Sequence, residues 1–283
     1  METRPIRKHL FFMYAATLSA LIGIHGCHSN EPYSTTNKDT HDSSTEDSVE
    51  FHPVANWTRE TTIGQIVAQQ PQTARIFELV GIDYCCGGNT PLGKAAKENQ
   101  IDQTRLLRAL SVVGMPKADG DHRNWQTADL GELIDHVVNR HHTWLRRELP
   151  SLIETTNTVF NVHGDNHEEL KEVAEIIERF QAVVLPHLDD EERRVFPAVR
   201  ELIAGRPPAD MADLLGEMQS DHDSLGQDLH RLRTLTKGFS EPPDACAKYR
   251  EMLNGLKSLE DDMHTHVHLE NNVLLPRALK LLN

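Results

Sequence analysis

Apolar residues recur at steps of three and four along the second half of this chain, the spacing of a single buried face on an α-helix. One such stripe leads up to His142 and consists of Leu130, Leu133, Ile134, Val137 and Val138. Another leads up to His187 and consists of Leu170, Val173, Ile176, Ile177 and Phe180. The pattern predicts amphipathic helices whose apolar faces continue into the two histidines.

Polar residues in the same half form an internal repeat. The motif is a histidine, a glutamate four residues later and a proline ten residues later, and it occurs at His187, Glu191 and Pro197 and again at His266, Glu270 and Pro276. Upstream of each copy, leucines follow His142 and His222 at the same three offsets of three, seven and ten residues. Each copy of the repeat therefore contains one histidine and then a His-x-x-x-Glu pair.

The spacing of the repeat predicts the fold. His142 precedes His187 by 45 residues and His222 precedes His266 by 44. Such a separation fits one helix, a turn and an antiparallel helix that returns to the same level. Two hairpins of this kind form a four-helix bundle, which we place at residues 127–283 of an all-α protein.

The histidines and glutamates of the repeat are candidate metal ligands. On a helix, residues four apart share a face, so His266 faces the same way as Glu270 while His264 and His268 point elsewhere. Four imidazoles and two carboxylates at one level of a bundle suit non-haem iron or manganese, and carboxylates can bridge two ions. We expect two irons with open coordination positions for small molecules such as dioxygen, nitric oxide or water. A bundle without metal would leave these inward polar residues unexplained.

Other polar residues are expected to have minor roles. The remaining histidines of this half are interpreted as surface groups or neighbours of the ligands: His136, His141, His163, His167, His230, His264 and His268. Asp221 and Asp190 follow or precede ligands closely enough to orient an imidazole, although Asp190 fits a solvated surface better. Cys246 is interpreted as a small packed residue rather than a nucleophile.

These motifs carry a family resemblance. Residues 128–283 resemble a hemerythrin-type domain, and "HLDDEERRVFP" and "LENNVLLPRAL" are similar to the RIC family of di-iron proteins that repair iron centres. The resemblance places six residues on iron-ligand positions: His142, His187, Glu191, His222, His266 and Glu270. It makes Glu191 and Glu270 the bridging carboxylates. Oxygen-carrying hemerythrins have a further histidine one turn from the third-helix ligand, where this chain has Met218 and Gly226, so the resemblance argues against an oxygen carrier.

A second resemblance covers Thr61 to about Val113, whose "CCGG" is similar to the short module that precedes the bundle in RIC-type proteins. Thr61 or Thr62 can cap a helix, Pro71 can open the next, "GID" can end it and "TPLGKAA" can begin another. We therefore predict a small helical module at residues 58–116. Cys85 and Cys86 are either an exposed thiol pair for redox, metal or nitrosyl transfer, which is their candidate catalytic role, or two small residues in a tight turn.

The segment that precedes this module has a different composition. Arg4, Arg7 and Lys8 precede an uncharged run, and "IHGC" resembles a lipoprotein cleavage box at Cys27, so residues 1–27 are typical of a signal segment. Residues 28–57 are polar and are expected to form a disordered tether. This predicts an exported or lipid-tethered protein in the cell envelope. An inward-facing anchor or a different start codon, with the cytoplasmic location that the family resemblance implies, remains the alternative.

The formal net charge of −14 and the lack of a basic stripe disfavour nucleic acid as a partner. The leading hypothesis is a di-iron protein that repairs iron-sulfur clusters damaged by nitric oxide or peroxide, with the damaged iron-sulfur proteins as its partners. The alternatives are a protein that binds or senses oxygen or nitric oxide, and an enzyme that reduces nitric oxide. Whether the protein is an enzyme and whether it forms a homodimer stay open.

Overall fold

The computed structural model describes residues 57–113 and 123–282, and within them all regular structure is helical. The all-α fold class is thereby confirmed. The signal-like segment with Cys27 and nearly all of the polar tether lie outside the described residues. Among the described helices, none combines the length and the apolar character needed to cross a membrane.

Residues 57–113 fold into short helices around a small core. These are α1 (Ile63–Gln69), the 3₁₀ turn η2 (Pro71–Thr73), α2 (Ala74–Val80), α3 (Leu92–Glu98) and α4 (Gln103–Val113). Thr62 caps α1 in a reciprocal capping box with Gln65. Gly81 ends α2 in a left-handed conformation, with φ 72°. The capping, opening and closing signals in the sequence are therefore used as predicted.

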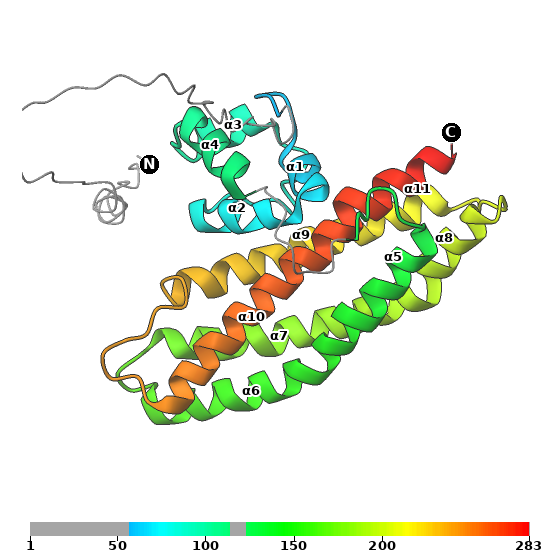
Figure 1. Ribbon diagram of the computed structural model, residues 1–283. Helices are drawn as coiled ribbons and strands as arrows, with labels where there is room; N and C mark the ends of the chain where they lie inside the picture. Colours follow the sequence, from blue (N-terminus) through cyan, green and yellow to red (C-terminus); the bar gives the residue numbers. More distant parts are fainter. Residues whose placement is uncertain (1–56, 114–122, 283) are drawn as a thin grey trace, which may run out of the picture. The chain divides into compact units, whose positions relative to one another are not determined.

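Residues 130–282 form an antiparallel four-helix bundle (Figure 1). Its first helix comprises α5 (Leu130–His136), η3 (Val137–His142) and α6 (Thr143–His163); its second comprises α7 (Glu169–Asp190), η4 (Glu191–Val195) and α8 (Phe196–Ile203). The third is α9 (Met211–Leu235), and the fourth comprises α10 (Ala247–Leu269), η5 (Glu270–Leu274) and α11 (Leu275–Leu282). The two hairpins that the repeat predicts are confirmed.

The segments η3, η4 and η5 are π-helical turns, in which a backbone N–H bonds to the carbonyl five residues earlier. The closing bonds run from Thr143 to Val138, from Phe196 to Glu191 and from Leu275 to Glu270. Pro197 and Pro276 follow two of these bonds directly, and a proline has no N–H with which to continue the α-helical ladder. The proline of each repeat thus favours a widened turn that begins at its glutamate.

Two apolar clusters fill the bundle on either side of these turns. One contains Leu149, Phe180, Leu229 and Leu256, and the other contains Leu133, Phe196, Leu215 and Leu274. Along the first helix, for example, His142 lies between Val137 of one cluster and Leu145 of the other. Polar groups at this level are shielded from water on both sides, so they must find partners within the bundle.

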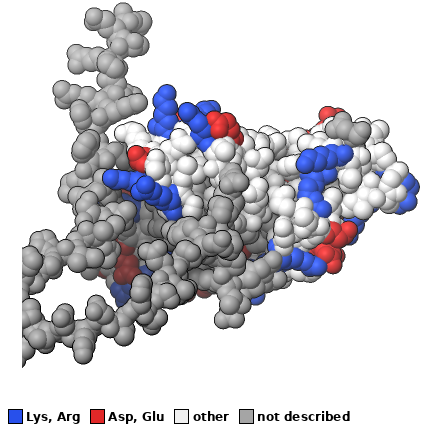
Figure 2. Space-filling view, turned by 45° about the horizontal axis from the view of Figure 1, so that its top comes forward, with Lys and Arg blue, Asp and Glu red and all other residues white. Residues whose placement is uncertain are grey.

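The described residues 57–113 and 123–282 belong to one compact unit, so the contacts do not separate the module from the bundle. The division into a 58–116 module and a 127–283 bundle stays a prediction. On the face drawn in Figure 2, Lys and Arg side chains are scattered, and Asp or Glu stands beside several of them. The absence of a nucleic-acid partner also stays a prediction.

Phe180 is fully buried in the bundle core, whereas Val183, three residues further along α7, is 43% exposed. We expect Phe180→Ala to lower the free energy of unfolding by about 3–5 kcal/mol, because it removes buried apolar surface and leaves a cavity. Val183→Ala should change it by no more than about 0.5 kcal/mol. Urea unfolding of both variants at matched metal content measures this, and equal losses would contradict the placement of α7.

Candidate metal centre

The six predicted ligands lie together inside the bundle, and each of its four helices contributes at least one of them. His142 ends η3, His187 lies in α7, Glu191 begins η4, His222 lies in α9, His266 lies in α10 and Glu270 begins η5. All six are buried, and His187 is the most exposed of them at 7%. The donor atoms of these histidines and glutamates lie close enough together to share a metal ion. The cluster can therefore hold one.

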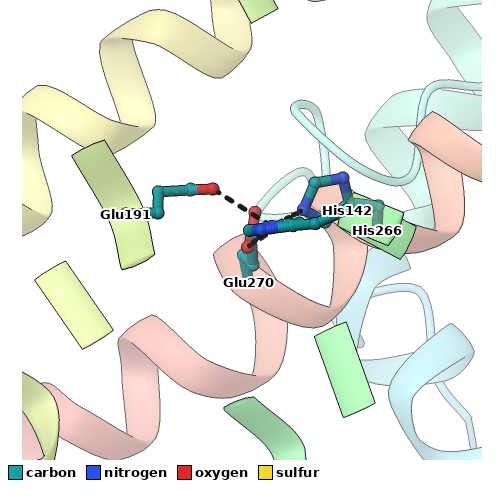
Figure 3. A group of neighbouring side chains, drawn as sticks. All are labelled: His142, Glu191, His266 and Glu270. Carbon is teal, nitrogen blue, oxygen red and sulfur yellow. Dashed lines mark hydrogen bonds and ion pairs between the residues drawn. The ribbon is translucent and has the colours of Figure 1, made fainter. Parts of the chain in front are cut away.

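The four imidazoles are arranged as two pairs. His142 Nε2 lies 3.2 Å from His266 Nε2, and His187 Nε2 lies 3.0 Å from His222 Nε2. Figure 3 shows the first pair with Glu270 below it and Glu191 opposite. The sequence did not indicate which histidines go together. The pairing combines the first helix with the fourth and the second with the third.

Each carboxylate extends one oxygen toward each pair. For Glu191, Oε2 lies 3.3 Å from His142 Nε2, while Oε1 lies 3.1 Å from His187 Nε2 and 3.5 Å from His222 Nε2. For Glu270, Oε1 lies 3.1 Å from His266 Nε2, while Oε2 lies 3.2 Å from His222 Nε2. The two carboxylates therefore span the two imidazole pairs, which is the arrangement that a bridge between two cations requires.

The outer nitrogen of three imidazoles is held by an oxygen. His142 Nδ1 lies 2.8 Å from Glu192 Oε1, His187 Nδ1 lies 3.2 Å from Asp221 Oδ2, and His222 Nδ1 lies 2.9 Å from Asn271 Oδ1. Carboxylate and amide oxygens only accept hydrogen bonds, so Nδ1 must donate. A neutral imidazole that donates from Nδ1 presents the lone pair of Nε2 to the centre, as a metal ligand must.

Glu192 and Asn271 were not predicted from the sequence. Each follows a repeat glutamate directly, so the register of the repeat was the signal that could have found them. Arg146 holds Glu192 in place, with Nη1 at 2.7 Å from Glu192 Oε1. Asp221 contacts a predicted ligand as expected, and the side chain of Asp190 is 44% exposed and paired with Arg194.

The negative charges of Glu191 and Glu270 require a positively charged partner. Among the described residues, no directed hydrogen bond reaches either oxygen of Glu191 or Oε2 of Glu270, although all three are buried. Burial opposes the ionisation of Glu191, but contacts with three imidazoles outweigh it and hold the pKa of its carboxyl well below the usual range. Burial and Glu191 oppose the ionisation of Glu270, yet the contacts with His266 and His222 lower its pKa to about 2. Three buried carboxylate oxygens without a directed hydrogen bond suit a cation, so the donor set fits a metal.

The same carboxylates also shift the pKa values of the imidazoles. Burial lowers the pKa of His142, His187 and His222, but contact with Glu191 in each case outweighs it and raises the pKa above its ordinary value. For His266 burial dominates and the pKa is lowered. A proton on Nε2 occupies the lone pair that a metal would use, so protons compete with metal for the centre.

The neighbouring histidines of the fourth helix point away from the centre, as predicted. His264 and His268 pack edge-on against Tyr84, with ring centroids 5.8 and 5.6 Å away. His141 is buried as well: its Nδ1 lies 3.1 Å from Asp262 Oδ1 and its ring stacks on His266. His141 is therefore a neighbour of a predicted ligand and not a surface group.

The cysteine turn lies against the ligand helix α9. Cys85 and Cys86 are free thiols whose backbone N–H groups both donate to Asp83 Oδ1. Cys86 Sγ lies 3.6 Å from the backbone oxygen of His222. The expectation of an exposed pair is wrong for Cys85, which is 5% exposed, and the hydrogen bond with Cys86 together with burial raises the pKa of its thiol. The catalytic role of the two thiols stays a prediction.

Asn272 fixes the turn to the bundle. Its Nδ2 donates to the backbone oxygens of Cys85 (2.9 Å) and Tyr84 (3.3 Å). Asn271, next to it, holds His222. The widened turn η5 therefore contacts both a predicted ligand and the cysteine turn. Cys246 is exposed at the start of α10, so its interpretation as a packed residue is wrong.

Comparison with known proteins gives the same two parts. Residues 133–278 match the hemerythrin HHE cation binding domain, and residues 59–113 match a domain described as of unknown function (DUF542). The iron-sulfur cluster repair protein YtfE of Enterobacter sp. strain 638 is 32% identical over 78% of this chain and 97% of its own length. The repair protein ScdA of Staphylococcus haemolyticus is 33% identical over 77% of this chain and 97% of its own.

This chain belongs to the iron-sulfur cluster repair protein family. The hemerythrin HHE match spans all six buried donors, and the second match spans Cys85 and Cys86. As a member of the repair family, the chain thus combines a bundle of a cation-binding class with a cysteine module in the order that the sequence resemblance indicates.

Glu270 and Asp190 provide a matched test of the centre. We expect Glu270→Ala to lower the iron retained per chain by about half or more, since its carboxylate contacts both imidazole pairs, while Asp190→Ala leaves the iron content near that of the wild type. Metal analysis of the purified variants, with circular dichroism as a folding control, measures this. Equal iron loss in the two variants would contradict the assignment of Glu270.

Metal retention should weaken as the pH falls through and below the raised pKa values of His142, His187 and His222. Below those values the imidazoles hold protons that must leave before a metal can bind. Titration of the metal-free protein with Fe²⁺ or Mn²⁺ by calorimetry, in buffers of different ionisation enthalpy, measures the released protons. Binding without proton release across pH 6–8 would show that the imidazoles are not the groups that bind.

Proposed function

We propose that this protein repairs iron-sulfur clusters damaged by nitrosative or oxidative stress, and that it does so with a labile centre of two irons. The observation that supports two ions most directly is the division of the buried donors into two imidazole pairs joined by two carboxylates. The relatives are named as iron-sulfur cluster repair proteins, which supports damaged iron-sulfur clusters as the target of this protein. The damaged iron-sulfur proteins are then the partners.

In this proposal His142 and His266 hold one iron and His187 and His222 hold the other, with Glu191 and Glu270 bridging. Six protein ligands shared by two ions leave coordination positions open. Bound iron would supply redox chemistry and exchangeable metal for a damaged cluster. The apolar clusters shield the centre on two sides, and Glu192, Asp221 and Asn271 keep three of the imidazoles in the metal-binding tautomer.

The lability of the centre follows from its unequal burial. A surface pocket of about 370 Å³ reaches His187 and Glu191 and is lined by Asp190, Glu217 and Asp221, the first two of which pair with Arg194. His142 and His266, by contrast, are 0% and 1% exposed. We propose that iron enters and leaves on the His187 side, where the pocket reaches two of the donors and Asp221 lies beside His187.

The surroundings of His222 favour repair over oxygen carriage. One turn to either side, Met218 is buried and a Cβ at Gly226 would lie 3.3 Å from Cys86 Sγ. The space beside this histidine is thus occupied by the thiol of the module and not by a further imidazole. We propose that Cys86 assists the delivery of iron or of electrons. Binding of small gases, a homodimer and a membrane tether through Cys27 stay predictions.

Repair can be tested with a purified [4Fe–4S] dehydratase that nitric oxide or peroxide has inactivated. The full chain, loaded with iron and handled without oxygen, is expected to contain two irons and to restore dehydratase activity in the presence of a reductant. Glu270→Ala should lose most of both properties. Cys85→Ser/Cys86→Ser should keep near-normal iron but repair more slowly, because the thiols lie outside the donor set.

Two controls separate the alternatives. The reductant with free Fe²⁺ measures repair without the protein. Nitric oxide consumption without a dehydratase measures turnover of the gas. If the protein consumes nitric oxide but does not restore the dehydratase, nitric oxide reduction replaces repair as its function. If the protein binds no iron, neither function has a chemical basis.

A further inference from the structure

The α6–α7 and α9–α10 connections meet at the end of the bundle opposite α8 and α11 (Figure 1). His163 is the last residue of α6, and His167 lies in the turn that leads to α7. Asp244 and Cys246 lie in the connection from α9 to α10, where Cys246 is the N-cap of α10. Four metal-ligating side chains from two different hairpins are thereby brought to one place.

Their donor atoms are close together. His163 Nε2 lies 3.2 Å from Cys246 Sγ, and His167 Nε2 lies 3.0 Å from Asp244 Oδ2. One donor atom each of His163, His167 and Asp244 lies within 4.8 Å of the other two. With bonds of about 2.0–2.3 Å, tetrahedral ligands of a zinc ion lie roughly 3.3–3.8 Å from one another. Binding would therefore draw His163, His167 and Asp244 together and move Cys246 Sγ, which contacts His163, toward the other two.

The rings are also oriented. Glu169 Oε1 lies 3.2 Å from His167 Nδ1. Nδ1 therefore donates to this carboxylate, and a neutral His167 presents the lone pair of Nε2 to the cluster. The buried ring of Tyr249 packs against both imidazoles, with centroids 5.3 Å from His163 and 5.4 Å from His167. The backbone N–H of Tyr249 donates to Cys246 Sγ at 3.4 Å and fixes the sulfur.

We propose that His163, His167, Asp244 and Cys246 form a second metal site, which takes a divalent cation of the zinc class. Two imidazoles, one carboxylate and one thiolate are a closed tetrahedral set, and a thiolate selects softer cations than the oxygen and nitrogen donors of the buried centre. The thiol loses its proton when the cation binds.

The site would link the α6–α7 connection to the α9–α10 connection and so hold the two hairpins together. Helix α6, which has 21 residues, separates it from His142. At the rise of an α-helix, this length places the site about 30 Å along the bundle from His142. The proposed second site can therefore be tested independently of the iron centre and of the repair function.

The test uses the full chain, loaded with iron, with its thiols reduced and without oxygen, and titrates it with Co²⁺. We expect one cobalt per chain beyond the iron, with thiolate-to-cobalt charge-transfer absorption and the intense visible bands of tetrahedral cobalt. Zn²⁺ should displace the cobalt. Cys246→Ser should abolish the charge-transfer band, and His163→Ala or His167→Ala should weaken binding by more than about tenfold, since even partners behind a ligand contribute roughly 10- to 100-fold to metal affinity.

Matched controls assign the signal. Cys85→Ser/Cys86→Ser removes the other free thiols of the described residues, and His230→Ala removes an exposed histidine of α9, so both should keep the cobalt bands. The iron content of every variant reports that the bundle is folded. A charge-transfer band that survives Cys246→Ser or disappears with Cys85→Ser/Cys86→Ser would overturn the proposal. Absence of a cobalt signal would do the same and would leave His167 and Asp244 as an ion pair.

Discussion

The burial of two ionised carboxylates at one level of the bundle is the constraint on which the rest of the structure depends. Glu191 and Glu270 are 1% and 0% exposed. A buried carboxylate without a partner is very costly. Four imidazoles surround the two groups, and their contacts lower the pKa of both carboxyls. The same carboxylates raise the pKa of three of the imidazoles, so protons compete with a metal for these nitrogens.

The backbone is shaped to present these groups. Each glutamate begins a π-helical turn, and each turn is followed by a proline that cannot continue the α-helical ladder. The turn that begins at Glu270 also positions the next two side chains: Asn271 holds His222, and Asn272 holds the cysteine turn. One local distortion thus orients an imidazole and fixes the module beside it.

The two groups of metal donors differ in how deeply they are buried. The donors that can hold iron lie between two apolar clusters, and a surface pocket reaches them on the His187 side. The proposed zinc-class site lies at the far end of the bundle, where its donors are half-buried or exposed and include a thiol. Hard, enclosed donors and softer, open donors are therefore separated by the length of α6, about 30 Å at the rise of an α-helix. Two metals of different class could occupy the chain without competing.

The sequence by itself determined the bundle and the six central residues, because helical periodicity and a repeated His-x-x-x-Glu spacing are local properties that survive in one dimension. It also indicated the breaks of the short helices at Pro71 and Gly81 and narrowed the first cap to Thr61 or Thr62, since these residues act through neighbouring backbone groups. Only the tertiary structure decided which imidazoles pair, that Cys85 is buried, and that Glu192 and Asn271 hold ligands. These features depend on which helices lie side by side. Contacts between side chains of different helices arise from packing, and the spacing of residues along the chain does not determine them.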